Sequence, residues 1–227
     1  VRRDGTMREY VAVPWQKVID AGEISPRDCA LIEPMSVGFH AVSNAEVTDS
    51  DIVMVIGCGM IGLGAVIRAA LRGATVIAVD LDDEKLELAK KLGAAYGINS
   101  KTDDVHKQVT RITEGLGADV VIEAVGTPAT YVMAVDEVGF TGRVVCIGYA
   151  KSEVSFQTKY FVQKELSIRG SRNAMPKDFR AVIRYLKKGS CPCDELITKI
   201  VEPEFALSAL QEWAEAPGKV FRILVKF

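Results

Sequence analysis

The sequence has no long apolar run, no excess of charge of either sign, and too few cysteines for a disulfide framework. No apolar stretch approaches the roughly 20 residues that cross a bilayer, and the opening Val1-Arg2-Arg3-Asp4 lacks the apolar segment of a signal peptide. A net charge of −2 with dispersed basic residues gives no reason to expect nucleic acid as a partner. The five cysteines are odd in number and irregularly spaced, which indicates a reducing, cytoplasmic location.

The central part of the chain alternates short β-branched runs with helical stretches. Ile52-Val53-Met54-Val55-Ile56 is a continuous apolar run of strand length, typical of a parallel strand covered on both faces. The expected strands are 52–56, 75–80, 96–98, 119–125, 143–149 and 166–169, with helices at 60–71, 83–92, 104–114 and 128–138 between them. Strands that alternate with helices of this length imply right-handed crossovers and a parallel sheet. The sequence therefore predicts an α/β fold with a doubly wound, six-stranded parallel sheet of the Rossmann type.

The two ends of the chain do not continue this alternation. Met7 to Pro14 reads as a strand already under way, so we expect that an N-terminal portion is missing. A turn at 20–22 and a short helix opened by Ser25 follow it. Beyond the central part, the pattern predicts helices at 177–188 and 204–215 and strands at 197–201 and 219–227. We expect the flanks, 1–35 and 171–227, to be parts of one domain that a second domain, at 36–170, interrupts.

A glycine-rich loop, Gly57-Cys58-Gly59-Met60-Ile61-Gly62, joins the first expected strand to its helix. Gly57 permits the tight turn, Gly59 lets a pyrophosphate approach the backbone, and Gly62 lets the helix pack close to its strand. The helix N-terminus offers free N–H groups to phosphates. Asp80 ends the next strand, where it would accept hydrogen bonds from ribose hydroxyls and repel a 2′-phosphate. This pattern predicts NAD rather than NADP; the alternatives are a turn with glycines for packing alone and a methyltransferase-like nucleotide site.

Glu33 lies inside the apolar segment 30–41, directly before Pro34. A carboxylate in such a segment costs free energy to bury unless it has a partner. The partner of Glu33 could be a metal ion; the alternatives are that Glu33 caps the start of the helix or forms a salt bridge. His40, on the apolar helix that follows, is better explained as a packed core histidine than as a ligand.

The sequence resembles the C-terminal two-thirds of the zinc-dependent medium-chain dehydrogenases, in the branch of sorbitol and threonine dehydrogenases. The segments that carry this resemblance occur in family order: 4–10, 31–34, the glycine loop, 80–81, 122–126, 142–145 and 170–173. The stretches 170–174 and 176–179 are similar to members that act on sugar acids, such as L-galactonate 5-dehydrogenase.

The resemblance implies a role for several positions. Glu33 corresponds to the glutamate at the family's catalytic zinc, and Arg172 and Asn173 to residues beside the substrate. The implied NAD-binding residues are Gly57, Gly59, Met60, Ile61, Gly62, Asp80, Lys85, Ile147, Gly148, Tyr149, Ser171 and Arg172. For Arg172, a surface arginine that caps a loop is the alternative. The resemblance also implies a homo-oligomer whose sheets join edge to edge, through the strand at 143–149 or at 166–169.

The family's remaining zinc ligands have no counterpart in this sequence. The resemblance implies that 1–35 is a remnant of a GroES-like catalytic domain, that 36–170 is the NAD-binding domain, and that 171–227 returns to the catalytic domain. In the family, the catalytic zinc also needs a Cys and a His-Glu pair from the N-terminal part of that domain, and a structural zinc needs four closely spaced cysteines. Cys191-Pro192-Cys193 reads as a loop, and Cys29, Cys58 and Cys146 as buried fillers. One carboxylate cannot hold catalytic zinc, which usually takes three protein ligands, so no catalytic residue is assigned with certainty.

These observations predict an NAD-dependent enzyme that oxidises a secondary alcohol of a polyol or sugar acid with zinc in the intact protein. The chain as given is expected to bind the cofactor but to be inactive. Its expected partners are a small-molecule alcohol or sugar-acid substrate, without nucleic acid or membrane. The alternatives are a non-catalytic dinucleotide-binding module and a zinc-free reductase of the same superfamily; the reductases prefer NADP, which Asp80 disfavours.

Overall fold

The computed structural model describes residues 5–216, 218 and 220–227, and these fall into two compact units. The larger unit is Ile32–Val182; the smaller one combines the described residues up to Leu31 with those from Ile183 onward. The sequence placed the corresponding boundaries after residues 35 and 170. Within the described ranges, no helix is long and apolar enough to span a membrane.

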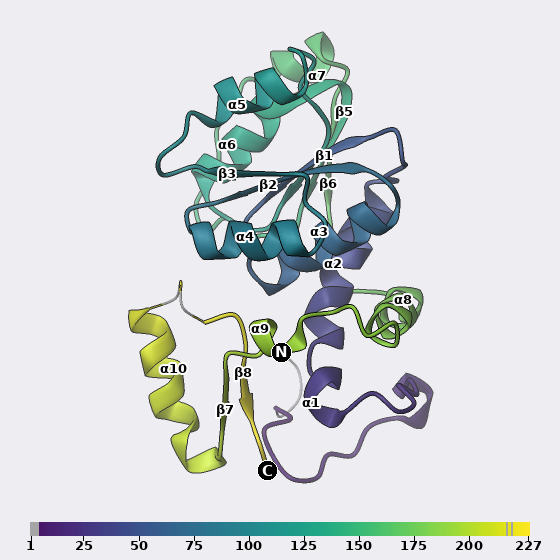
Figure 1. The fold of residues 1–227 in the computed structure, drawn as a ribbon. Coiled ribbons are helices and arrows are strands. Elements are labelled where there is room, and N and C mark those ends of the chain that lie inside the picture. The colour runs from purple at the N-terminus through teal and green to yellow at the C-terminus, as the bar shows by residue number, and fades with distance from the viewer. Residues whose placement is uncertain (1–4, 217, 219) are drawn as a thin grey trace. The chain divides into compact units, whose positions relative to one another are not determined.

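The larger unit contains a parallel, six-stranded sheet in the order β3-β2-β1-β4-β5-β6, which confirms the doubly wound fold. The strands are β1 Ile52–Ile56, β2 Thr75–Asp80, β3 Tyr96–Asn99, β4 Ala118–Glu123, β5 Val138–Cys146 and β6 Ser167–Gly170. The helices are α2 Ile32–Asn44, α3 Met60–Leu71, α4 Asp83–Lys91, α5 Val105–Ile112, α6 Pro128–Glu137 and α7 Lys159–Gln163. Figure 1 shows α3 and α4 on one face of the sheet and α5 and α6 on the other.

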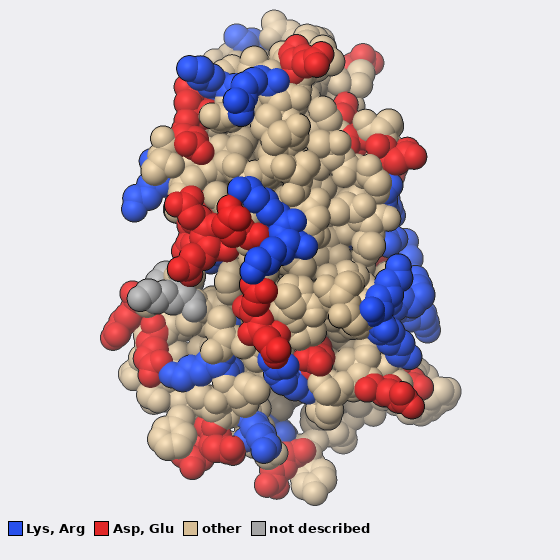
Figure 2. All heavy atoms as spheres, in the orientation of Figure 1, with Lys and Arg blue, Asp and Glu red and all other residues tan. Residues whose placement is uncertain are grey.

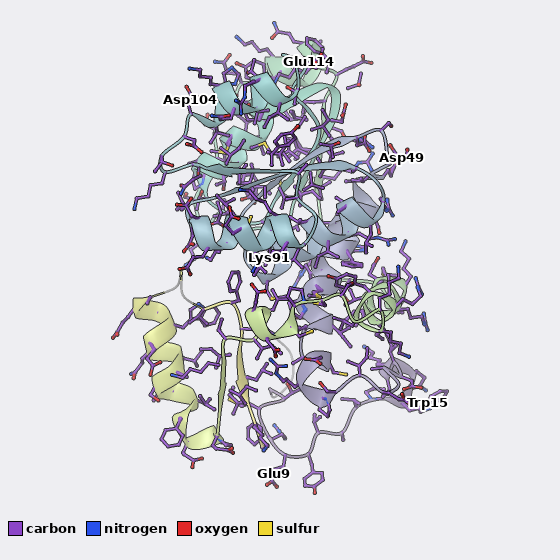
Figure 3. All side chains as sticks on the ribbon, viewed as in Figure 1. Glu9, Trp15, Asp49, Lys91, Asp104 and Glu114 are labelled. Carbon is purple, nitrogen blue, oxygen red and sulfur yellow. The ribbon has the colours of Figure 1, made fainter. Side chains whose placement is uncertain are left out.

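The apolar strand residues form the core because both sheet faces are covered by helices. Met54, Ile77 and Val121 are fully buried and belong to one cluster with residues of α5 and α6. Polar residues mark the helix ends instead. The side chain of Asp104 accepts a hydrogen bond from the Lys107 amide at the start of α5, and Lys91 lies in the last turn of α4. Figure 3 shows both side chains at these helix termini, where their charges suit the helix dipole.

The expected strands at 119–125 and 143–149 both end earlier in the structure. β4 stops at Glu123 because the amides of Val125 and Gly126 donate to the Glu123 carboxylate. β5 stops at Cys146, and the Ile147 amide donates to the Glu123 carbonyl. β5 also starts earlier than expected, at Val138. The shorter strand ends turn the following residues out of the sheet, at the edge where ligands bind in such folds.

The expectation that the strand at 143–149 joins the sheets of two subunits edge to edge is not met. β5 pairs with β4 on one side and with β6 on the other, so it lies inside the sheet. Only β3 and β6 lie at its edges. Association through β6, and the oligomeric state itself, stay predictions.

The smaller unit has short elements around a two-stranded parallel sheet of β7 and β8. Its elements are η1 Trp15–Lys17, α1 Pro26–Cys29, α9 Cys193–Leu196, β7 Lys199–Val201, η2 Pro203–Phe205, α10 Ala206–Glu215 and β8 Ile223–Val225. Helix α8, Pro176–Leu186, begins in the larger unit and ends in the smaller one. The helix opened by Ser25 is confirmed, since the Ser25 hydroxyl accepts from the Asp28 amide.

Two expectations for the ends of the chain need correction. Residues 7–14 form no strand: Tyr10 is 86% exposed, and no neighbouring strand satisfies this backbone in the described part of the chain. The expected closing strand starts at Lys219, which lies outside the described residues, and its described part forms a strand only at Ile223–Val225. Cys29 is half-buried rather than a core filler, whereas Cys58 and Cys146 are buried as expected. Cys193 is the first residue of α9 rather than part of a loop.

Candidate cofactor and substrate site

The glycine loop lies between β1 and α3 as the sequence predicts. Gly57 has a φ of +95°, a backbone conformation that favours glycine, and its amide donates to the Val79 carbonyl. A Cβ on Gly62 would lie 1.8 Å from the Gly57 carbonyl oxygen, so only glycine fits there. Gly59 is the N-cap of α3, and no side chain caps this helix. The first amides of α3 therefore face the loop without intrahelical acceptors, as an anion site requires.

Asp80 ends β2 beside this loop. One carboxylate oxygen accepts a hydrogen bond from the Cys58 amide at 2.6 Å, and the other accepts from the Leu81 and Asp82 amides. Each carboxylate oxygen has two lone pairs, so the oxygen that accepts only from Cys58 keeps acceptor capacity for a ribose hydroxyl. Burial raises the pKa of the Cys58 thiol far above its usual range. The positive charge of Lys85, in the first turn of α4, lies close enough to Cys58 to oppose part of this rise.

A cavity of about 400 Å³ lies at the carboxyl ends of β4, β5 and β6. It is lined by Glu33, Val37, Ile61, Ala124, Val125, Ile147, Gly148, Tyr149, Ser171, Arg172 and Asn173. All of these residues belong to the larger unit. The cavity thus brings together the implied metal ligand, one residue of the glycine loop, Ile61, and the implied nicotinamide and substrate residues. A doubly wound sheet binds its ligands at this edge.

Glu123 and Tyr131 hold the two turns that supply Val125 and Gly148 to the cavity lining. Glu123 is fully buried; its Oε1 accepts hydrogen bonds from the Val125 and Gly126 amides and from the Thr130 hydroxyl, at 2.7–2.9 Å. The Tyr131 hydroxyl donates to the Gly148 carbonyl at 2.7 Å. Burial and the neighbouring Cys146 and Glu123 raise the pKa of Tyr131 to about 12, so it stays a donor at neutral pH. The turns that follow β4 and β5 are therefore fixed relative to each other.

The segment after β6 supplies the polar side of the cavity. The Ser171 amide donates to the Cys146 carbonyl, and the Ser171 hydroxyl oxygen is buried with no hydrogen-bond partner among the described residues. A buried hydroxyl without a partner costs free energy unless a ligand or water satisfies it. Arg172 and Asn173 are exposed at the cavity, and Asn173 has a φ of +57°.

Glu33 lies in the first turn of α2 and lines the cavity, but it is exposed rather than buried. The expectation that its burial requires a partner is therefore wrong. The residues present do not fit a catalytic zinc ion, which usually takes three protein ligands. In the described ranges, no group of three or more His, Cys, Asp or Glu side chains could hold a metal ion. His40 is half-buried and bound to Asp178.

The sequence did not identify every residue of this site. Val37, Ala124 and Val125 line the cavity but were not among the expected site residues. Val37 follows Glu33 by one helical turn, a spacing that could have placed it on the same face. In the sequence, Glu123 reads as an ordinary strand residue. Its role is visible only in the structure, where its carboxylate accepts hydrogen bonds from the backbone amides of Val125 and Gly126.

Comparisons with known proteins show which family this chain is similar to. The family model described as "Zinc-binding dehydrogenase" matches residues 61–188. L-galactonate-5-dehydrogenase from Escherichia coli K12 is 34% identical over 87% of this chain and 58% of its own length. Sorbitol dehydrogenase from Halalkalibacterium halodurans is 30% identical over 99% of this chain and 66% of its own length. The chain therefore spans less than two thirds of either relative.

Solved structures share the fold over nearly the whole chain. Galactitol-1-phosphate dehydrogenase from Escherichia coli superposes with a TM-score of 0.87 at 30% identity, over 96% of this chain and 67% of that one. A protein described as a short chain alcohol dehydrogenase from E. coli CFT073, in complex with NADH, has a TM-score of 0.85 at 27% identity, over 95% and 64% of the two chains.

Proposed function

The chain belongs to the zinc-type medium-chain polyol dehydrogenase family, and we propose that it binds NAD for the oxidation of a secondary alcohol. The substrate class is a polyol or a sugar acid. The observation that supports this most directly is the common position of the glycine loop, Asp80 and the cavity at the carboxyl edge of one parallel sheet.

The proposed cofactor site follows from the geometry of these parts. The free amides at the start of α3 receive the pyrophosphate, and Asp80 accepts the hydroxyls of the adenosine ribose. Ile147, Gly148 and Tyr149 bind the nicotinamide end in the cavity, where the Ser171 hydroxyl gains a partner. Bound NAD supplies the hydride acceptor for the alcohol. The chain's own contribution is to orient the nicotinamide on the rigid turns that Glu123 and Tyr131 hold.

Arg172 and Asn173 are the proposed substrate residues, and their surroundings favour an anionic group on the substrate. Arginine matches carboxylate and phosphate groups with paired hydrogen bonds. The part of helix α8 in the larger unit, which follows directly, exposes Lys177 and Arg180, whereas its one acid, Asp178, is buried. Figure 2 shows acidic and basic side chains interspersed over most of the visible face, with a group of basic side chains at the right edge. Two similar proteins carry names with an acidic sugar derivative, L-galactonate and galactitol-1-phosphate.

Glu33 is the proposed ligand of a catalytic zinc ion in the whole protein. Because the described residues offer no further ligands around it, no chemical step is assigned to a metal here. A second candidate function is a dinucleotide-binding module without catalysis. A substrate contact at Arg172 distinguishes the two, since a plain module does not need one.

Cofactor titration tests the proposal. We expect NADH to bind at least about tenfold more tightly than NADPH, a difference of about 1.4 kcal/mol, because a 2′-phosphate would face the Asp80 carboxylate. Asp80→Ala removes this repulsion and should narrow the gap. Fluorescence or calorimetric titration of both cofactors measures it. Equal affinities in the wild type would contradict the role of Asp80, and no binding of either cofactor would contradict the proposed function.

A further inference from the structure

One face of α2 runs from the cavity to the start of α8. Glu33 and Val37 line the cavity; His40 and Asn44 follow them at helical spacing, seven and eleven residues after Glu33. These four residues therefore lie along one side of the helix. The last two contact the segment that follows β6, at its two ends.

The contact at one end is a hydrogen bond of 2.9 Å between His40 Nδ1 and Asp178 Oδ2. Asp178 is 3% exposed, and its carboxylate also accepts from the Met175 amide at 3.0 Å and from the Ser43 hydroxyl at 3.4 Å. The buried carboxylate is thus satisfied by α2 and by its own loop together. A buried carboxylate that loses one of its donors is destabilised.

The contact at the other end joins Asn44 to the end of β6. Asn44 Nδ2 donates to the Gly170 carbonyl at 3.0 Å, and an Arg169 guanidinium nitrogen donates to the Asn44 carbonyl at 2.8 Å. Residues 171–175 lie between the two attachments. Three of these, Ser171, Arg172 and Asn173, line the cavity opposite Glu33 and Val37.

The segment between the two attachments has no helix or strand of its own. Asn173 has a φ of +57°, in the left-handed region, which asparagine adopts more readily than most residues other than glycine. Arg172 and Asn173 are exposed, so burial does not hold their side chains in place. The segment is held by the Ser171 amide, which donates to the Cys146 carbonyl, and by the attachments to α2 at Asn44 and at His40.

We propose that His40 and Asp178 are positioning residues that hold the segment 171–175 on α2, so that Ser171, Arg172 and Asn173 meet the nicotinamide end of the cofactor. This inference rests on the proposed NAD site. It assigns a function to the His40–Asp178 pair, which otherwise only links α2 to α8.

The test compares two ligands that differ in the part of the site they reach. NADH fills the whole site, whereas ADP-ribose contains the adenosine, pyrophosphate and second ribose but no nicotinamide. We expect His40→Leu to weaken NADH binding by about fivefold or more, as the loss of a hydrogen bond to a carboxylate implies, and ADP-ribose binding by less than about twofold. His40→Asn places an amide donor near the position of Nδ1, and it should restore most of the NADH affinity.

The matched control is His106→Leu. His106 is the chain's other histidine and also bonds a buried carboxylate, that of Glu137, but it lies on α5 far from the segment 171–175 in sequence. This variant should leave both affinities unchanged. Asn44→Ala removes the side-chain hydrogen bond to the Gly170 carbonyl at the other end, but keeps the Asn44 carbonyl that accepts from Arg169, and it should act in the same direction as His40→Leu. It gives a second measurement if His40→Leu does not fold.

The outcomes separate this inference from the proposed function. If the wild type binds neither ligand, the proposed NAD site fails, and the inference fails with it. If the wild type binds both, but His40→Leu and Asn44→Ala weaken both equally or weaken neither, the positioning role is wrong while the NAD site stands. A selective loss of NADH affinity, restored by His40→Asn, supports the inference.

Discussion

Two glycines of the same loop should respond to alanine in opposite ways. At Gly59 a Cβ would have no atom within 4 Å, and the backbone, with φ −69° and ψ 180°, is one that alanine adopts readily. At Gly62 a Cβ would lie 1.8 Å from the Gly57 carbonyl oxygen, roughly half an ordinary contact distance of about 3.5 Å. Gly59 is therefore open toward a ligand, whereas Gly62 is closed by the protein itself.

The expected magnitudes follow from these distances. Gly59→Ala should change the free energy of unfolding by less than about 0.5 kcal/mol, or raise it slightly by restricting the unfolded chain. It should weaken NADH binding by about tenfold or more, or about 1.4 kcal/mol, because its methyl group would occupy space near the pyrophosphate. Gly62→Ala gains about 1 kcal/mol of helix propensity. Overpacking typically costs about 1–3 kcal/mol. A contact this short, with a backbone atom, requires the loop to move, so the cost should reach the upper end of that range or exceed it. After the gain in helix propensity, we expect a net loss of about 2 kcal/mol or more.

Denaturant unfolding and NADH titration of the same samples measure the two effects. The cofactor concentration must be zero in the unfolding experiment, because bound ligand stabilises the folded state. The reasoning is refuted if Gly59→Ala unfolds as easily as Gly62→Ala, or if it keeps the wild-type affinity for NADH. The second result would mean that the pyrophosphate does not approach the backbone at Gly59.

Two further predictions concern thiols and metal. In the folded chain, iodoacetamide at pH 8 should leave Cys58 and Cys146 unmodified, because both are buried and burial raises the pKa of each thiol, that of Cys146 to about 11. Mass spectrometry should find both cysteines modified in denaturant. Rapid labelling of either cysteine without denaturant would contradict this prediction. Protein purified without added zinc should contain well under one zinc per chain, since the described residues offer no group of three ligands. Elemental analysis measures the zinc content. One tightly bound zinc per chain would contradict the prediction, and Cys191 and Cys193 would be the first candidate ligands.

The order of strands and helices in the larger unit could be read from the sequence because its signals are local. The apolar run of β1 and the glycine loop lie within a dozen consecutive residues. Hydrophobic period and turn chemistry act at this range, so they predict an element whatever the rest of the chain does. The predicted helix at 60–71 and the strands at 52–56 and 75–80 match α3, β1 and β2 without change. The strand-like residues 7–14 show the limit of this approach, because a strand also needs a neighbour.

The details of the site were decided by tertiary structure. β4 ends at Glu123, rather than two residues later, because a buried carboxylate takes the amides that would have continued the strand. His40 and Asp178 are 138 residues apart, and no local pattern relates them. Glu33 was expected to be buried because its sequence neighbours are apolar, yet those neighbours face the core while Glu33 faces the cavity. A side chain's burial and partners depend on which helix face meets the rest of the fold, and that is set by packing between segments distant in sequence.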